Sequence, residues 1–152
     1  MSPGRFDESV VRAKVETLKE MLRAIETLPL AKLDDFTADP HIPAAGESYL
    51  RRSLEAALDL GRHLLAKGFG IAAVEYKVIP RRLAEVGVLD AQRAALLNEM
   101  TGHRNRLVHE YHRVQPDELF RILAEHRSDL ADLGEVLRSW IASQPERLDR
   151  EL

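Results

Sequence analysis

The sequence contains no cysteine, and this absence excludes several kinds of chemistry. The chain can form no disulfide, and it offers no thiolate to act as a nucleophile or to bind zinc or an iron–sulfur cluster. No apolar run approaches the roughly 20 residues that cross a bilayer, and residues 1–8 are polar, unlike a signal peptide. We therefore expect a cytoplasmic protein with no membrane partner.

Aromatic residues are also scarce, and the chain has no net positive charge. Aromatics make up 5% of the 152 residues, so the core has to be built from Leu, Ala, Val and Ile. The net charge is −3, so any contact with nucleic acid must come from a local basic patch rather than from bulk charge. The length, with 45% hydrophobic and 31% charged residues, predicts a single globular domain spanning residues 1–152.

Apolar residues recur at helical spacing almost throughout the chain, in steps of three and four. The expected helices run from Asp7 to Pro29, from Leu50 to Lys67, from Pro80 to Gly87, from Ala91 to about His112, and from Pro116 to Ser143, with room for one short turn between the first two. Because a single strand would have no partner, we interpret the β-branched stretch around 69–77 as a loop.

Several residues mark the helix ends or explain local packing. Asp7 and Asp90 are expected N-caps, and Gly68 is the expected C-terminal cap of the second long helix. Gly61, inside that helix, predicts a close approach of another helix. Four or five antiparallel helices with short loops predict an all-α, up-and-down bundle. The chain has no glycine-rich phosphate loop, βαβ pattern or G-x-S-x-G motif, which excludes P-loop, Rossmann and α/β-hydrolase enzymes.

One segment runs against the acidic balance of the chain. Residues 101–113 read T-G-H-R-N-R-L-V-H-E-Y-H-R, with three arginines, three histidines and a formal charge of +2. Arg104 falls on the apolar stripe that also carries Leu97, Met100, Leu107, Val108 and Tyr111. An arginine on such a stripe either pairs with an acid from another helix or meets an anionic ligand, and the first is commoner for an arginine considered alone.

The other polar residues also have ordinary structural interpretations when each is taken alone. His109 is compatible with a hydrogen-bonded surface or core residue, and Tyr111 with a packed ring at the rim of a helix. For His126, on the apolar stripe of the last helix, a satisfied core or interface histidine is the better interpretation.

Together, however, Arg104-Asn105-x-x-x-His109-x-Tyr111 matches the pattern R-N-x-x-x-H-x-Y. This closely resembles the signature of the HEPN superfamily and of its HepT branch, the toxin half of the MNT–HEPN toxin–antitoxin pair. The resemblance implies a small helical bundle that acts as a metal-independent endoribonuclease on RNA, without a cofactor and as a homodimer. It further implies an MNT-type nucleotidyltransferase antitoxin, which attaches AMP to Tyr111.

The residue types suit this chemistry. His109 can serve as the acid or base, Arg104 can stabilise the charge of the phosphate, and Asn105 can orient one of them by hydrogen bonding. Four further side chains of the segment are expected to contact RNA: His103, Arg106, His112 and Arg113. No aromatic platform for bases and no RNA-fold motif is visible, so the sequence does not indicate which RNA sequences are preferred.

The spacing of Arg104 and His109 raises a geometrical problem. Five residues correspond to about 500°, so the two side chains point about 140° apart on an ideal helix. Either the helix ends or bends near His109, or two copies of the motif meet across the axis of a dimer and pool their side chains.

Two other functions remain open. One is a non-catalytic helical module that binds a minimal nucleotidyltransferase. The other is a metal enzyme that uses His109, Glu110 and His112, since His-x-x-His places two imidazoles on one face. Metal sites in helix bundles need Glu-x-x-His on two helices, however, and neither Glu99 nor Glu125 has a histidine at that spacing. We therefore expect no metal site.

Overall fold

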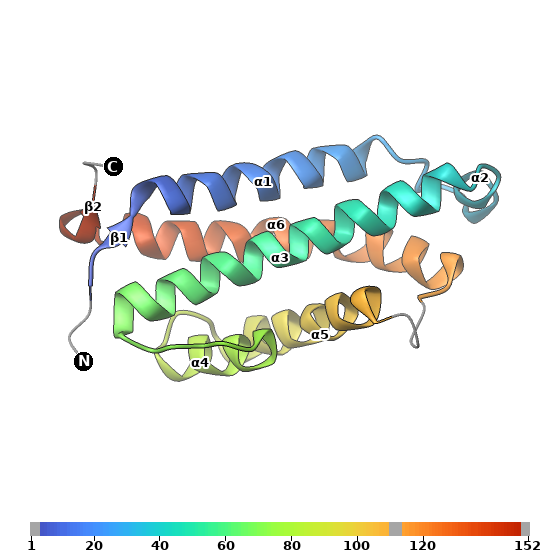
Figure 1. Ribbon diagram of the computed structural model, residues 1–152. Helices are drawn as coiled ribbons and strands as arrows, with labels where there is room; N and C mark the ends of the chain where they lie inside the picture. The colour runs from blue at the N-terminus through green and yellow to red at the C-terminus, as the bar shows by residue number, and fades with distance from the viewer. Residues whose placement is uncertain (1–3, 110–113, 150–152) are drawn as a thin grey trace.

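The computed structural model describes residues 4–109 and 114–149, which form an all-helical bundle. Its six α-helices are α1 (Glu8–Glu26), α2 (Leu33–Thr37), α3 (His41–Phe69), α4 (Ile79–Glu85), α5 (Ala91–Val108) and α6 (Pro116–Ala142). Helices α1, α3, α5 and α6 alternate in direction along the bundle, while α2 and α4 lie in the connections between them (Figure 1). The predicted all-α, up-and-down fold is confirmed.

The 29-residue helix α3 is the centre of the bundle, because it contacts each of the other five α-helices. Small residues on its surface allow these contacts to be close. A Cβ atom at Gly61 would lie 3.0 Å from Cγ2 of Ile79 and 3.1 Å from Cδ1 of Leu83, both on α4. The close helix approach expected at Gly61 is confirmed.

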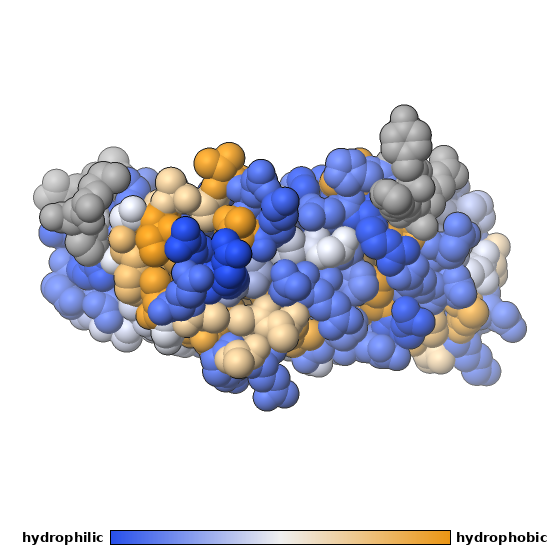
Figure 2. Space-filling view, turned by 90° about the horizontal axis from the view of Figure 1, so that it is seen from below, coloured by the Kyte–Doolittle hydropathy of each residue, from blue (hydrophilic) through white to orange (hydrophobic). Residues whose placement is uncertain are grey.

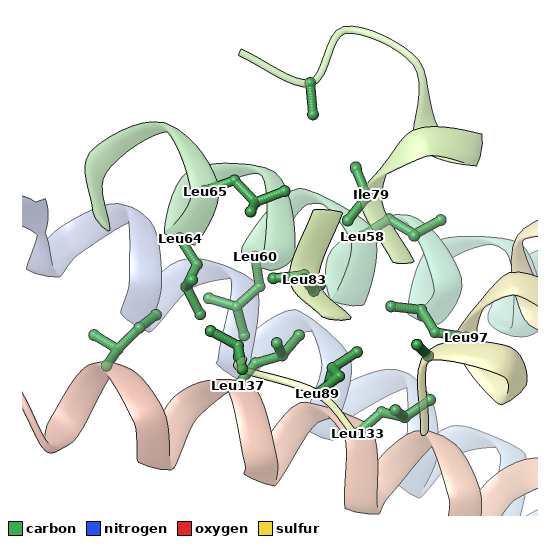
Figure 3. Close-up of a cluster of buried hydrophobic side chains, with 14 of the residues drawn as sticks. Leu58, Leu60, Leu64, Leu65, Ile79, Leu83, Leu89, Leu97, Leu133 and Leu137 are labelled. Atoms are coloured by element: carbon green, nitrogen blue, oxygen red, sulfur yellow. The ribbon is translucent and has the colours of Figure 1, made fainter. Parts of the chain in front are cut away.

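The core is built largely from aliphatic side chains. Figure 3 shows leucines and one isoleucine from α3, α4, α5 and α6, with Leu89 just before α5, pointing toward one another. Leu97 of α5 belongs to this cluster, and Met100, one turn later, belongs to a second cluster with α3 and α6; both are fully buried. Because both clusters hold α5, the helix is anchored up to the turn that carries the polar segment.

Two predicted boundaries of α3 are wrong. The helix begins at His41, nine residues before the stripe that predicted it, because Pro43 is tolerated in a first turn whose N–H groups have no partner within the helix. It ends at Phe69, with Gly70 in the left-handed conformation (φ 67°). Gly68, the predicted cap, lies inside the helix, where a Cβ would sit 3.2 Å from the Phe6 ring.

The predicted end of α5 near His112 is also wrong, because the helix ends at Val108 and His109 has extended backbone angles (φ −104°, ψ 111°). Of the two solutions to the spacing problem, the structure contains the first, a helix that ends just before His109. The other predictions for the connections are confirmed. Residues 70–75 are a loop, followed by a 3-10 helix (Tyr76–Val78), and Pro80 lies in the first turn of α4.

The two ends of the described chain meet at one end of the bundle (Figure 1). Strand β1 (Phe6–Asp7) pairs in parallel with β2 (Leu148–Asp149), which follows a 3-10 helix (Pro145–Arg147). The Arg147 guanidinium donates hydrogen bonds to the Lys67 and Gly68 carbonyls at 3.1 and 2.6 Å, satisfying the C-terminus of α3. Among the described helices, none combines the length and the apolar character that a bilayer crossing requires.

Candidate functional site

The candidate site begins where the apolar stripe of α5 becomes polar. Arg104 occupies the position one turn after Met100, and its side chain is 23% exposed. Asn105 is half-buried beside it, and His109, just beyond the helix end, is exposed. The helix is fixed by its buried half, so the backbone that carries Arg104 and Asn105 is held in place.

A surface cavity of about 440 Å³ brings the three motif residues together. It is lined by Arg62 of α3, by residues 74–77, and by Arg104, Asn105 and His109. Three of these side chains, Arg62, Lys77 and Arg104, are cations, and Glu75 is the single carboxylate among them. We call this the motif cavity. Its lining is basic although the chain as a whole is acidic, which suits an anionic ligand.

The Arg104 guanidinium has loose contacts with protein. Its Nη2 atom lies 3.9 Å from Oε2 of Glu55 on α3, the acid from another helix that the sequence made probable. Its Nη1 donates to Oδ1 of Asn105 at 3.3 Å, and its Nε is buried without a hydrogen-bond partner among the described residues. Since 3.9 Å exceeds hydrogen-bond distance, Arg104 keeps donors for a ligand.

Tyr76, which sequence analysis missed, positions both arginines of the motif cavity. The Arg62 and Arg104 guanidinium carbons lie 4.6 and 4.7 Å from the centre of its ring, within the range of cation–π contacts. The Tyr76 hydroxyl donates a 2.6 Å hydrogen bond to Asp59. Burial raises the pKa of Tyr76 to about 12, and the hydrogen bond to Asp59 acts in the same direction. Tyr76 is therefore a neutral phenol at physiological pH and serves as a platform rather than a base.

Arg62 was also missed, because it lies on a different helix from the motif. Its guanidinium donates 2.9 Å hydrogen bonds to the carbonyls of Ala73 and Val74, which hold the loop before the 3-10 helix against α3. The loop in turn forms one wall of the motif cavity. The only signal in the sequence for this wall of the cavity was Tyr76, an aromatic residue between Glu75 and Lys77 in a chain that has few aromatics.

His109 also borders a second cavity of about 500 Å³, whose lining includes Glu47, Leu107 and residues 114–116. The Arg106 guanidinium, at its edge, makes two hydrogen bonds with the Glu118 carboxylate in the first turn of α6, one of them 2.8 Å from Nη2 to Oε2. This pair holds the pKa of Glu118 below its usual value. It joins the last turn of α5, which precedes His109, to the first turn of α6.

The remaining predicted residues lie elsewhere. His103 lines neither cavity; its side chain is 13% exposed and faces Glu99. Glu110, Tyr111, His112 and Arg113 lie outside the described residues. His126 is part-buried, with Nδ1 3.0 Å from the Asp129 carboxylate, in agreement with a satisfied histidine.

Figure 2 shows the side of the bundle on which α4 and α5 lie. Hydrophilic side chains cover most of this face, and hydrophobic ones gather at the end occupied by α4. Within the described part, Val108 at the end of α5 is one of the few exposed large hydrophobic residues, with 39% exposure. The surface around the motif is thus mainly polar, with an apolar residue next to His109.

Comparison with known proteins agrees with this geometry. Residues 16–137 match the protein family described as Ribonuclease HepT-like. A curated relative, the tRNA nuclease HepT of Aphanizomenon flos-aquae (strain 2012/KM1/D3), is 24% identical over 116 residues, which cover 76% of this chain and 78% of the relative.

Two solved structures share the fold. The tri-AMPylated HEPN toxin of Shewanella oneidensis, in complex with MNT antitoxin, has a TM-score of 0.77 at 20% identity, covering 86% of this chain and 97% of that chain. YutE, a cytosolic protein of unknown function from Bacillus subtilis, has a TM-score of 0.78 at 18% identity, covering 95% and 98%.

The burial of Tyr76, together with its hydrogen bond to Asp59, predicts a specific dependence of stability on pH. Because folding raises the pKa of this phenol from about 10 to about 12, its contribution is fully present below pH 10 and is lost as the pH rises from 10 to 12. The melting temperature should therefore fall more steeply over this range in the wild type than in Tyr76→Phe. Tyr49→Phe serves as the control and should follow the wild type; equal slopes for the wild type and Tyr76→Phe would contradict the assignment.

Proposed function

We propose that this chain, which belongs to the Ribonuclease HepT-like family, is a toxin that cleaves RNA internally without a metal ion. The observation that carries the proposal is that Arg104, Asn105 and His109 line one basic cavity in an acidic protein. The curated relative is named a tRNA nuclease, so tRNA is the first substrate to test. A cytoplasmic location follows from such a substrate.

The motif cavity suits a transesterification at phosphorus. Arg104 binds the non-bridging oxygens of the scissile phosphate and stabilises the charge that develops on them. Asn105 holds the Arg104 guanidinium in position through its 3.3 Å hydrogen bond. Arg62 and Lys77, which line the same cavity, attract the neighbouring phosphates with their positive charge. Such contacts carry no base information, so the proposal assigns these side chains to affinity rather than to sequence preference.

His109 carries the proton transfers. A base removes the proton of the 2′-hydroxyl, whose oxygen attacks phosphorus; the bond from phosphorus to the 5′-oxygen breaks, and an acid protonates that oxygen. One imidazole is poorly placed to act on both sides of the phosphorus at once. A second copy of the chain would supply a second His109 and would cover the exposed Val108 beside it. We therefore propose a homodimer with the two motifs near its axis.

The expected dimer can be measured directly. Light scattering on the purified chain at micromolar concentration should give about twice the monomer mass of 17.2 kDa. The change Val108→Asp introduces a charge at the proposed seam and should shift the protein toward the monomer. A wild-type monomer under these conditions would contradict the shared site.

Cleavage should depend on the motif side chains and not on metal. In EDTA, the wild type should cut tRNA. His109→Ala should lower the rate by about 10²–10⁴-fold, as for loss of an acid or base, and Arg104→Ala by about 10²–10³-fold. His41→Ala and Arg23→Ala, exposed residues on α3 and α1, are the matched controls and should keep the wild-type rate.

His109 is exposed, so its replacement should change the free energy of unfolding by no more than about 0.5 kcal/mol. Full activity of His109→Ala would overturn the catalytic assignment. If the wild type binds a nucleotidyltransferase but cleaves no RNA, the chain is instead a non-catalytic binding module.

We further propose that an MNT-type nucleotidyltransferase neutralises this toxin by attaching AMP to Tyr111. Tyr111 follows His109 by two residues and lies outside the described part of the chain. The solved HEPN toxin in complex with MNT antitoxin is itself tri-AMPylated, which supports the same chemistry here. An adenylate near His109 would bring negative charge to Arg104 and would compete with the RNA phosphate.

Mass spectrometry of the intact chain tests this step. Co-expression with the partner nucleotidyltransferase should add adenylate increments to the wild type and remove its toxicity. Tyr111→Phe should show neither effect, while Tyr49→Phe should behave like the wild type. Adenylate increments that persist in Tyr111→Phe would rule out this residue.

A further inference from the structure

Helices α5 and α6 are joined by a line of polar contacts outside the motif cavity. Near the start of α5, Arg93 Nε lies 2.9 Å from Oδ2 of Asp132. Near its end, Arg106 pairs with Glu118. Between these two ion pairs lie Glu99 and His103 of α5 and His126 of α6, which we call the histidine cluster. The proposed nuclease chemistry uses none of the contacts within this cluster.

The histidine cluster has the dimensions of an ion site. Oε1 of Glu99 lies 3.9 Å from Nε2 of His103 and 4.0 Å from Nε2 of His126, and all three ligand atoms lie within 4.8 Å of one another. These distances are too long for hydrogen bonds. In a tetrahedral zinc site with bonds of about 2.0–2.1 Å, the ligand atoms are about 3.4 Å apart. The two distances from Glu99 would have to shorten by about 0.5–0.6 Å, and the Glu99 side chain, which is 54% exposed, has room to move. The ring nitrogens of His103 and His126, which lie within 4.8 Å of each other, would have to approach by up to about 1.4 Å.

The two imidazoles are prepared to act as ligands. His126 Nδ1 lies 3.0 Å from the Asp129 carboxylate. When Nδ1 donates this hydrogen bond, the proton is on Nδ1 and the lone pair of Nε2 is available to bind a metal ion. His103 Nε2 is buried and has no hydrogen-bond partner among the described residues. A buried polar atom without a partner is costly, and an ion would remove that cost.

We propose that Glu99, His103 and His126 bind a divalent transition-metal ion such as Zn²⁺, which clamps α5 to α6. Two imidazoles and one carboxylate form the donor set of known zinc sites that keep a position open for water. Asp129 acts from behind His126 by fixing its tautomer. None of the three ligand residues lines the motif cavity or the second cavity. The role of the ion is therefore to hold the turn of α5 that precedes Arg104, not to take part in RNA cleavage.

The surrounding charges favour a cation. Glu99 and Asp129 supply two carboxylates, and the charge of Arg106, a cation that acts on His103, is balanced by its pairing with Glu118.

The sequence pattern concealed this arrangement. A search for Glu-x-x-His on paired helices finds nothing, because Glu99 and His103 are four residues apart and the third donor comes from another helix. Residues at this spacing share one face of a helix, as residues three apart do. The prediction that the chain has no metal site was based on the narrower pattern.

Titration of the metal-free protein tests the proposal. Tag-free protein dialysed against EDTA and then against buffer should bind one Zn²⁺ per chain by calorimetry, and Co²⁺ should give visible absorption bands. Zn²⁺ at 100-fold excess over its dissociation constant should raise the melting temperature by about 5 °C or more. His103→Gln, His126→Gln and Glu99→Gln should each weaken binding at least tenfold, and Asp129→Asn about tenfold.

His41→Gln, at an exposed histidine of α3, is the matched control and should bind Zn²⁺ like the wild type. Circular dichroism establishes that each variant is folded. If His103→Gln does not fold, Glu99→Gln still tests the proposal, because Glu99 is exposed and its replacement should leave the fold intact. Wild-type affinity in both His126→Gln and Glu99→Gln would overturn the proposal. So would loss of binding in His109→Ala or His112→Ala with the cluster intact, because the ion would then lie at the motif.

Discussion

An α-helix turns by about 100° per residue, so two side chains five residues apart cannot face one cavity while the helix continues. In this chain α5 stops at Val108, and the extended backbone of His109 places its side chain at the same cavity as Arg104. The Arg106–Glu118 pair joins the last turn of α5, just before His109, to the first turn of α6. The candidate site therefore depends on where one helix ends.

The fold could be predicted because its information is local and repeated. Stripes of leucine at three- and four-residue spacing, the caps Asp7 and Asp90, and Pro116 at the start of α6 each specify an element within a few residues. The end of α5 carries no such signal. Neither proline nor a capping glycine directly follows Val108, and the Arg106–Glu118 pair, which joins the last turn of α5 to α6, forms between residues twelve positions apart in the sequence.

The candidate site was predictable only on α5. The motif identified Arg104, Asn105 and His109, because their pattern lies within six residues of sequence. Tyr76 and Arg62 complete the same cavity from a loop and from α3, and nothing in their own neighbourhoods indicates this. Side chains brought together by tertiary packing show no regular spacing in the sequence. The half of the cavity that Tyr76 and Arg62 form therefore became visible only in three dimensions.

Arg104 and Arg106 show how the placement of acids divides labour along one helix. Both arginines lie in the same turn of α5, and each faces a carboxylate of another helix. Arg106 meets Glu118 in a two-bond pair, which engages both of its terminal nitrogens and makes it a structural link. Arg104 meets Glu55 only at 3.9 Å, rests on the Tyr76 ring and keeps donors unsatisfied. An arginine held in this way is stabilised enough to stay half-buried, yet it retains the hydrogen-bonding capacity that an entering phosphate requires.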